Sequence, residues 1–215
     1  YKATQTYEHL CHLIGHEQVH LYVVDELLSA ELVVTSLEFR HERMSALKSV
    51  LSQEKKIIVT HPYALLKPIS SKDTMLNSVI NLEVNQEIQL EKLYRNLIKL
   101  GYKRTPSTIS VGDFSVRGGV IDIYPIGEKY PIRLDMFGEE IDQIKTFDPN
   151  TQMSSGSCTS ITIYPLVDLL YDSDKTEQIT NKIARYLHTP SNKFIQDMQD
   201  LKNYENNERL SKYIK

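Results

Sequence analysis

The chain has 215 residues, of which 40% are hydrophobic and 25% are charged, and its formal net charge at pH 7 is -3. This composition is typical of a globular protein. Because no apolar run approaches twenty residues, it excludes a membrane-spanning, collagen-like or disordered chain. The slightly acidic balance gives no general argument for nucleic-acid binding, which favours a basic domain, and leaves room for a local basic patch alone.

The start of the chain and its cysteines bear on where the protein works. The chain begins with Tyr1 rather than Met and shows no signal-peptide pattern, so we expect a piece of a longer protein. Its two cysteines, Cys11 and Cys158, are far apart in sequence and form no CxxC pair, which favours a reducing compartment. We therefore expect a cytoplasmic protein with no membrane association.

Residues 1–78 follow the pattern of an α/β layer. Apolar residues at helical spacing predict a helix over 4–14, and the short apolar runs 19–24 and 55–60 predict two strands. Between these strands, residues 36–51 again show helical spacing. A strand, a helix and a strand of these lengths predict a right-handed parallel crossover, so we expect a partial RecA-like domain of the nucleotidase type.

Residues 79–166 have a different rhythm and predict a separate α+β domain. A β-forming run at 80–84 precedes an amphipathic helix expected over 89–100. The β-forming runs within 113–147 are joined by glycine, proline and charged pairs, which is typical of an antiparallel meander. Residues 167–215 are polar and favour helix. The whole sequence thus predicts an α/β fold with an α+β insertion and a helical C-terminal segment.

Residues 114–127, FSVRGGVIDIYPIG, place two glycines directly after an arginine at the start of a strongly β-forming run. Gly118 and Gly119 suit a positive-φ bend or a bulge, which changes the direction of the chain and orients the side chain of Arg117. Alternation along the run places Asp122 on the outer side and the isoleucines beside it in the core.

The next run, PIRLDMF, carries an arginine and an aromatic residue on its outer side. Alternation places Arg133, Asp135 and Phe137 outward and the apolar residues between them in the core. Arginine and aromatic residues together are enriched at binding hot spots. The alternative is a solvated ion pair of Arg133 with Asp135 or Glu139, worth less than about 1 kcal/mol, with Phe137 packed under a loop. Pattern alone favours this second interpretation.

The sequence offers no catalytic centre. Residues 23–26, VVDE, imitate the apolar strand and acidic residue that hold Mg²⁺ in nucleoside triphosphatases. None of the eight glycines, however, belongs to a G-x-x-x-x-G-K-[ST] motif, so phosphates would find no backbone cradle and no lysine. Glu139 and Glu140 are adjacent on a predicted strand and point to opposite faces, which excludes them as an acid–base pair. We therefore expect a noncatalytic chain without a cofactor.

A group of histidines near the N-terminus superficially suggests a metal site, together with one cysteine: His9, Cys11, His12, His16 and His20. These residues run from a predicted helix across Gly15 into a predicted strand, so they cannot all share one face. Ordinary surface and capping histidines are the favoured interpretation, and we expect no metal.

A long segment resembles a known family. FSVRGGVIDIYPIGEKYPIRLDMFGEEIDQIKTFDPNTQMS is similar to the segment shared by the excision repair protein UvrB and the bacterial transcription-repair coupling factors. The shared pattern is F-x-V-R-G-x-x-I-D-I-Y-P, then P-x-R-[LI]-x-x-F, E-I-D-x-I and F-D-x-x-T-Q. Residues 90–104 and 36–47 agree as well, so the resemblance covers the chain to about residue 172.

Two differences separate the chain from UvrB. In UvrB a long tyrosine-rich hairpin, which grips damaged DNA, lies between the strand corresponding to 20–24 and the helix corresponding to 36–47. Here that interval is residues 25–35, which are too few for the hairpin, and Ser115 stands where UvrB usually has arginine. The chain therefore resembles more closely the amino-terminal module of the coupling factors, which is similar to UvrB without the hairpin and without a working ATP site.

The resemblance implies that the α+β domain binds UvrA, the damage-recognition ATPase, and recruits it to RNA polymerase stalled at a lesion. The family's contact residues carry over onto Arg117, Arg133 and Phe137. Asp135 and Glu139 are expected to hold the arginines in place. RNA polymerase and double-stranded DNA would be bound by regions of an ATP-dependent translocase that lie outside this chain. The alternative is a DNA-binding fragment of a UvrB-type helicase, which the missing hairpin and phosphate loop disfavour.

Overall fold

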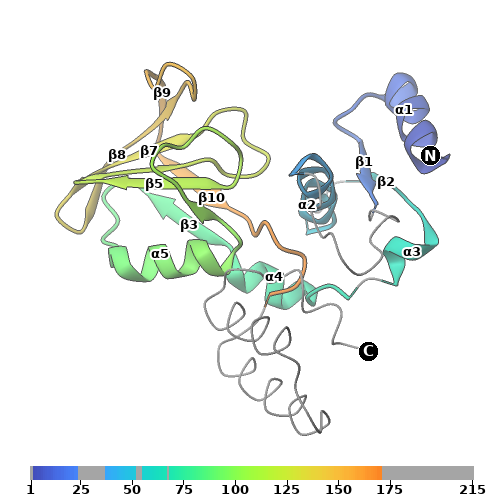
Figure 1. Ribbon diagram of the computed structural model, residues 1–215, viewed down its shortest axis with the longest axis horizontal. Helices are drawn as coiled ribbons and strands as arrows, with labels where there is room; N and C mark the ends of the chain where they lie inside the picture. Colours follow the sequence, from blue (N-terminus) through green and yellow to red (C-terminus); the bar gives the residue numbers. More distant parts are fainter. Residues whose placement is uncertain (1, 24–36, 52–54, 67, 171–215) are drawn as a thin grey trace, which may run out of the picture. The chain divides into compact units, whose positions relative to one another are not determined.

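The computed structural model describes residues 2–23, 37–51, 55–66 and 68–170. The fold combines helices with β-sheets and divides into two compact units (Figure 1). One unit is Met75–Leu166, and the other holds the described residues before it together with residues 167–170. Nearly all of the predicted helical segment 167–215 lies outside the described residues.

The first unit contains a parallel strand pair. Its elements are α1 (Lys2–Ile14), β1 (Val19–Tyr22), α2 (Leu37–Leu51), β2 (Ile57–Thr60) and α3 (Pro62–Leu65), and α4 (Lys72–Ser78) contains the sequence boundary between the units. β1 and β2 pair in parallel, and α2, which lies between them in sequence, contacts β1. The predicted parallel strand–helix–strand arrangement is confirmed, while its place in a RecA-like layer stays a prediction.

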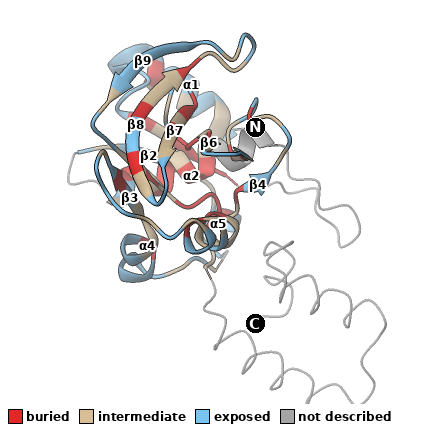
Figure 2. Ribbon diagram, turned by 90° about the vertical axis from the view of Figure 1, so that its left-hand side faces the viewer, coloured by how far each residue is buried: buried red, intermediate tan, exposed pale blue. Residues whose placement is uncertain are grey.

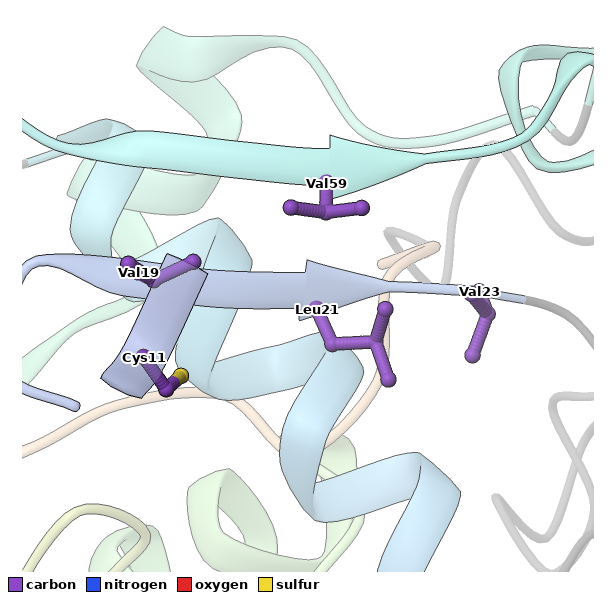
Figure 3. Packing of buried hydrophobic residues seen from close by; sticks show 5 residues of the cluster. All are labelled: Cys11, Val19, Leu21, Val23 and Val59. Atoms are coloured by element: carbon purple, nitrogen blue, oxygen red, sulfur yellow. The ribbon is translucent and has the colours of Figure 1, made fainter. Parts of the chain in front are cut away.

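The core of the first unit forms where α1 meets the two strands. Gly15 ends α1 as predicted: it has a φ of +93°, and its N–H donates to the carbonyl oxygen of Cys11 at 2.9 Å. Figure 3 shows the apolar side chains that α1, β1, the residue after β1, and β2 bring together, which are Cys11, Val19, Leu21, Val23 and Val59. Their burial holds the helix against the strands.

The second unit contains ten-residue helix α5 (Leu90–Lys99) and two sheets. In the smaller sheet, β3 (Ile80–Glu83) pairs antiparallel with β10 (Ser160–Ile163). The larger sheet has the order β4 (Lys103–Arg104), β5 (Asp113–Arg117), β6 (Val120–Ile123), β7 (Ile132–Phe137), β8 (Glu140–Phe147) and β9 (Ser154–Cys158). β4 is parallel to β5, and each later strand is antiparallel to its neighbour, which confirms the predicted meander.

One face of the larger sheet forms the core of the second unit. α5 lies along this face (Figure 1), and its Tyr94 ring stacks on the ring of Phe114 with centroids 6.4 Å apart. Leu93 and Leu97 of α5 are buried. The strand residues that alternate toward the same side are buried too: Phe114, Ile121, Ile123, Ile132, Leu134 and Ile144. Figure 2 shows buried stretches beside exposed ones in this unit.

A β-bulge in β8 lies opposite the end of β7. Asp135 pairs with Gln143 and Met136 with Ile141, so Asp142 of β8 is the extra residue. Met136, which the sequence pattern places in the core, is half-buried rather than buried.

Within the described ranges, no helix is both long and apolar enough to cross a membrane. In the same part of the chain, no group of three or more His, Cys, Asp or Glu side chains is arranged to hold a metal ion. Cys11 and Cys158 are free thiols.

Candidate functional site

A row of polar residues crosses the face of the larger sheet opposite α5. Strand register places Ser115 of β5 opposite Asp122 of β6, Asp122 opposite Arg133 of β7, and Arg133 opposite Lys145 of β8. Residues directly opposite one another point to the same side of a sheet. Since Phe114 points to α5, Ser115 and the rest of this row point away from it.

The carboxylate of Asp122 is the centre of this row. Its side chain is 0% exposed, yet both of its oxygens accept charge-assisted hydrogen bonds. Arg133 donates from Nε to Oδ1 at 2.7 Å and from Nη2 to Oδ2 at 2.9 Å. Arg117 donates from Nη2 to the same Oδ2 at 2.7 Å. The buried negative charge is therefore compensated by two guanidinium groups.

Arg133 is also fixed from two other directions. Its guanidinium carbon lies 4.5 Å from the centroid of the Phe147 ring, which is a cation–π contact. Its Nη1 donates to the backbone oxygen of Gln152 at 3.3 Å. The side chain is 18% exposed. Its pKa is raised above the ordinary arginine value, chiefly because the hydrogen bonds to Asp122 stabilise the charged form.

Arg117 is held more loosely, at the end of β5. The loop to β6 has two residues, and Gly118 has a φ of +59°, so the predicted positive-φ bend is confirmed. Gly119 allows the backbones of β6 and β7 to lie close together at this point. Its carbonyl oxygen accepts from the Met136 N–H at 2.8 Å, and an added Cβ would lie 3.2 Å from the Met136 backbone oxygen. Although it is bonded to Asp122, the Arg117 side chain is 51% exposed.

The two arginines border a surface depression of about 440 Å³. Its lining is Arg117, Val120, Arg133, Asp135, Lys145, Gln152 and Ser154. Lys145 donates from Nζ to Oδ2 of Asp135 at 2.7 Å across β7 and β8. With Asp122 beneath it, the depression brings three cations together with two carboxylates. Its charge therefore favours an anionic group of a binding partner.

Phe137 shares this side of the sheet but lies outside the depression. Alternation along β7 places it with Arg133 and Asp135, and it is 82% exposed. It precedes Gly138, whose φ of +64° opens the two-residue loop to β8. Among the described residues, the lining of the depression does not include Phe137. The structure thus brings the two predicted arginines together and leaves the predicted aromatic residue at the neighbouring hairpin end.

The carboxylate that holds the arginines differs from the expected ones. Asp135 accepts from Lys145, and Glu139 lines a separate cavity of about 470 Å³ beside α5 and β3. The direct partner of both arginines is Asp122, which sequence reasoning placed on the outer side without this role. The signal that could have found it is register, because Asp122 pairs with Arg133 across two strands of the meander.

Known proteins are similar to the part of the chain that holds this site, and to most of the chain as a whole. Residues 80–169 match the family of the UvrB interaction domain. Over 199 residues, which are 93% of this chain, it is 31% identical to the transcription-repair-coupling factor of Bacillus subtilis (strain 168). The chain is 30% identical to the same factor of Staphylococcus aureus (strain bovine RF122 / ET3-1) over 87% of the chain's own length. It is 27% identical to the factor of Staphylococcus haemolyticus (strain JCSC1435) over 85% of the chain's own length. The matches cover 17%, 15% and 16% of these curated relatives, so the chain spans a small part of their length.

Proposed function

We propose that the unit Met75–Leu166 is a noncatalytic module that binds UvrA, because residues 80–169 match the family of the UvrB interaction domain. In transcription-coupled nucleotide excision repair, such a module brings the damage-recognition protein UvrA to RNA polymerase stalled at a DNA lesion. The similarity of the chain to transcription-repair-coupling factors supports this role.

One observation carries the proposal: Arg117 and Arg133 converge on a single buried carboxylate, on a sheet face that points away from the core. Carboxylates on UvrA would bind the donors that remain, and each shielded charge-assisted hydrogen bond contributes about 1.5 to 3 kcal/mol. Phe137, at 82% exposure, supplies apolar area at the edge of this surface, and its full burial would contribute about 1.5 to 3 kcal/mol.

The first unit fits a supporting role. We infer that its parallel strand pair and α2 are part of a nucleotidase-type layer that does not hydrolyse ATP, because the sequence lacks a phosphate-binding loop. Contacts to RNA polymerase and double-stranded DNA, and any ATP-driven translocation, would come from regions outside this chain. The module would act in the cytoplasm, where these partners meet.

A second candidate is a DNA-binding fragment of a UvrB-type helicase. The cations Arg117, Arg133 and Lys145 around the depression favour it, since arginine and lysine bind phosphate groups. The net charge of -3 and the two carboxylates at the site disfavour it.

Titration of the full chain with UvrA and, separately, with a DNA duplex discriminates between the two candidates. Replacing Arg117 by Ala should weaken UvrA binding at least about tenfold, or roughly 1.4 kcal/mol, without unfolding the chain. Arg95→Ala is the matched control, because Arg95 is exposed on α5, away from the depression, and donates to the Glu91 carbonyl oxygen. Unchanged UvrA binding alongside lost DNA binding would reject the proposal in favour of the helicase fragment.

A further inference from the structure

We propose that Asp122 is the positioning residue of this surface. It holds the Arg133 side chain in one position at the depression and orients Arg117 toward the depression. The depression receives a carboxylate of the partner. The identity of that partner as UvrA rests on the proposed function. The positioning itself rests on the contacts among Asp122, Arg117 and Arg133.

The two arginines have different numbers of free donors. A guanidinium has five N–H donors. Arg133 engages its Nε, Nη1 and Nη2 atoms with Asp122 and the Gln152 carbonyl oxygen, and it is 18% exposed. Arg117 engages Nη2 with Asp122 and is 51% exposed. Arg117 is therefore the arginine with more donors available to the partner, and Arg133, held by Asp122, forms the less exposed part of the lining of the depression.

Asp122 is itself fixed from the side of β5. The hydroxyl of Thr108 donates to the backbone oxygen of Asp122 at 3.3 Å and lies 3.1 Å from the hydroxyl oxygen of Ser115. Thr108 and Ser115 are both buried. The Thr108 contact holds the backbone of Asp122, and the bonds from Arg117 and Arg133 hold its carboxylate. With both parts held, the carboxylate keeps one orientation and orients the side chains that donate to it.

The positioning role and simple charge attraction predict opposite changes in binding affinity for Asp122→Asn. Asp122→Asn removes one negative charge from beneath the depression, so charge attraction alone would strengthen binding of an acidic partner. If Asp122 positions the arginines, the substitution loses charge-assisted bonds to both of them. Arg117 then samples many rotamers, and binding weakens even though the surface has become more positive.

The binding experiment uses the full chain and UvrA in a calorimetric titration. We expect Asp122→Asn to lower the affinity roughly tenfold. Asp142→Asn is the matched control, because it makes the same charge change at an exposed residue of β8, and its affinity should equal the wild type or slightly exceed it. Unchanged or stronger binding by a folded Asp122→Asn variant would overturn the proposal.

A second measurement needs no partner and no variant. In the nuclear magnetic resonance spectrum of the wild-type chain, the Nε–H proton of Arg133 should exchange with water much more slowly than that of the exposed Arg104. Equal exchange at Arg133 and Arg104 would overturn the positioning role, whether or not the Asp122 variant folds. Slow exchange at Arg133 in a wild-type chain that does not bind UvrA would reject the proposed function and leave the positioning role supported.

Discussion

Replacing Arg133 by Ala should destabilise the second unit far more than replacing Arg117 by Ala. Arg133→Ala removes both bonds of the paired contact and leaves the buried Asp122 with the single bond from Arg117. Removing one partner of a buried ion pair costs about 3 to 5 kcal/mol, and the remaining bond places the expected cost near about 3 kcal/mol. Arg117→Ala keeps the paired contact and alters a half-exposed side chain, so its cost should be below about 1 kcal/mol.

Hydrogen exchange of the slowest backbone amides in β6 and β7 measures this difference within the full chain. A difference of about 2 kcal/mol between the stability losses of the two variants corresponds to roughly thirtyfold faster exchange in Arg133→Ala than in Arg117→Ala. Adding Asp122→Asn to Arg133→Ala should restore part of the stability, because the uncompensated charge is then gone. Equal exchange in the two single variants, or additive losses in the double variant, would refute the reasoning.

Three further outcomes are expected in the second unit. Tyr102→Phe should lower the free energy of unfolding by about 1 to 2 kcal/mol in a denaturant titration, because the Tyr102 hydroxyl donates to the Tyr164 carbonyl oxygen and accepts from the Ile126 N–H. Burial raises the pKa of Tyr102, so the folded state keeps this proton after the unfolded chain loses it. The contribution of the neutral Tyr102 hydroxyl to the free energy of unfolding is complete below the ordinary tyrosine pKa of 10.0 and is lost as pH rises above it. The free energy of unfolding of Tyr102→Phe should therefore lack this part of the decline at alkaline pH. Phe137→Ala should change stability by less than about 0.5 kcal/mol, because the ring is 82% exposed, while it weakens UvrA binding; a large loss of stability would show that the ring packs.

Several elements of both units could be predicted because their signals are local. Helical spacing before Gly15 predicts α1, and the glycine pair after Arg117 predicts a turn between two strands. Alternation also predicts that Phe137 points away from the core, and its side chain is exposed.

The centre of the site could not be predicted in the same way, because it depends on register between strands. Alternation placed Asp122 outward, where solvent would normally reach it, yet the structure buries it beneath two arginine side chains. Asp135, the carboxylate closest to Arg133 in sequence on the same side, pairs instead with Lys145 of the next strand. Met136 is half-buried opposite the bulge in β8, and the extra residue Asp142 leaves no trace in the β7 pattern.

The two-residue loops at Gly118 and Gly138 lie at the same end of the sheet, next to Arg117 and Phe137. Such short loops leave the backbone few alternative conformations, so these side chains lose little backbone entropy when a partner binds. Lengthening either loop with flexible residues would add that entropic cost without removing a contact, and it would act mainly by making the complex dissociate faster.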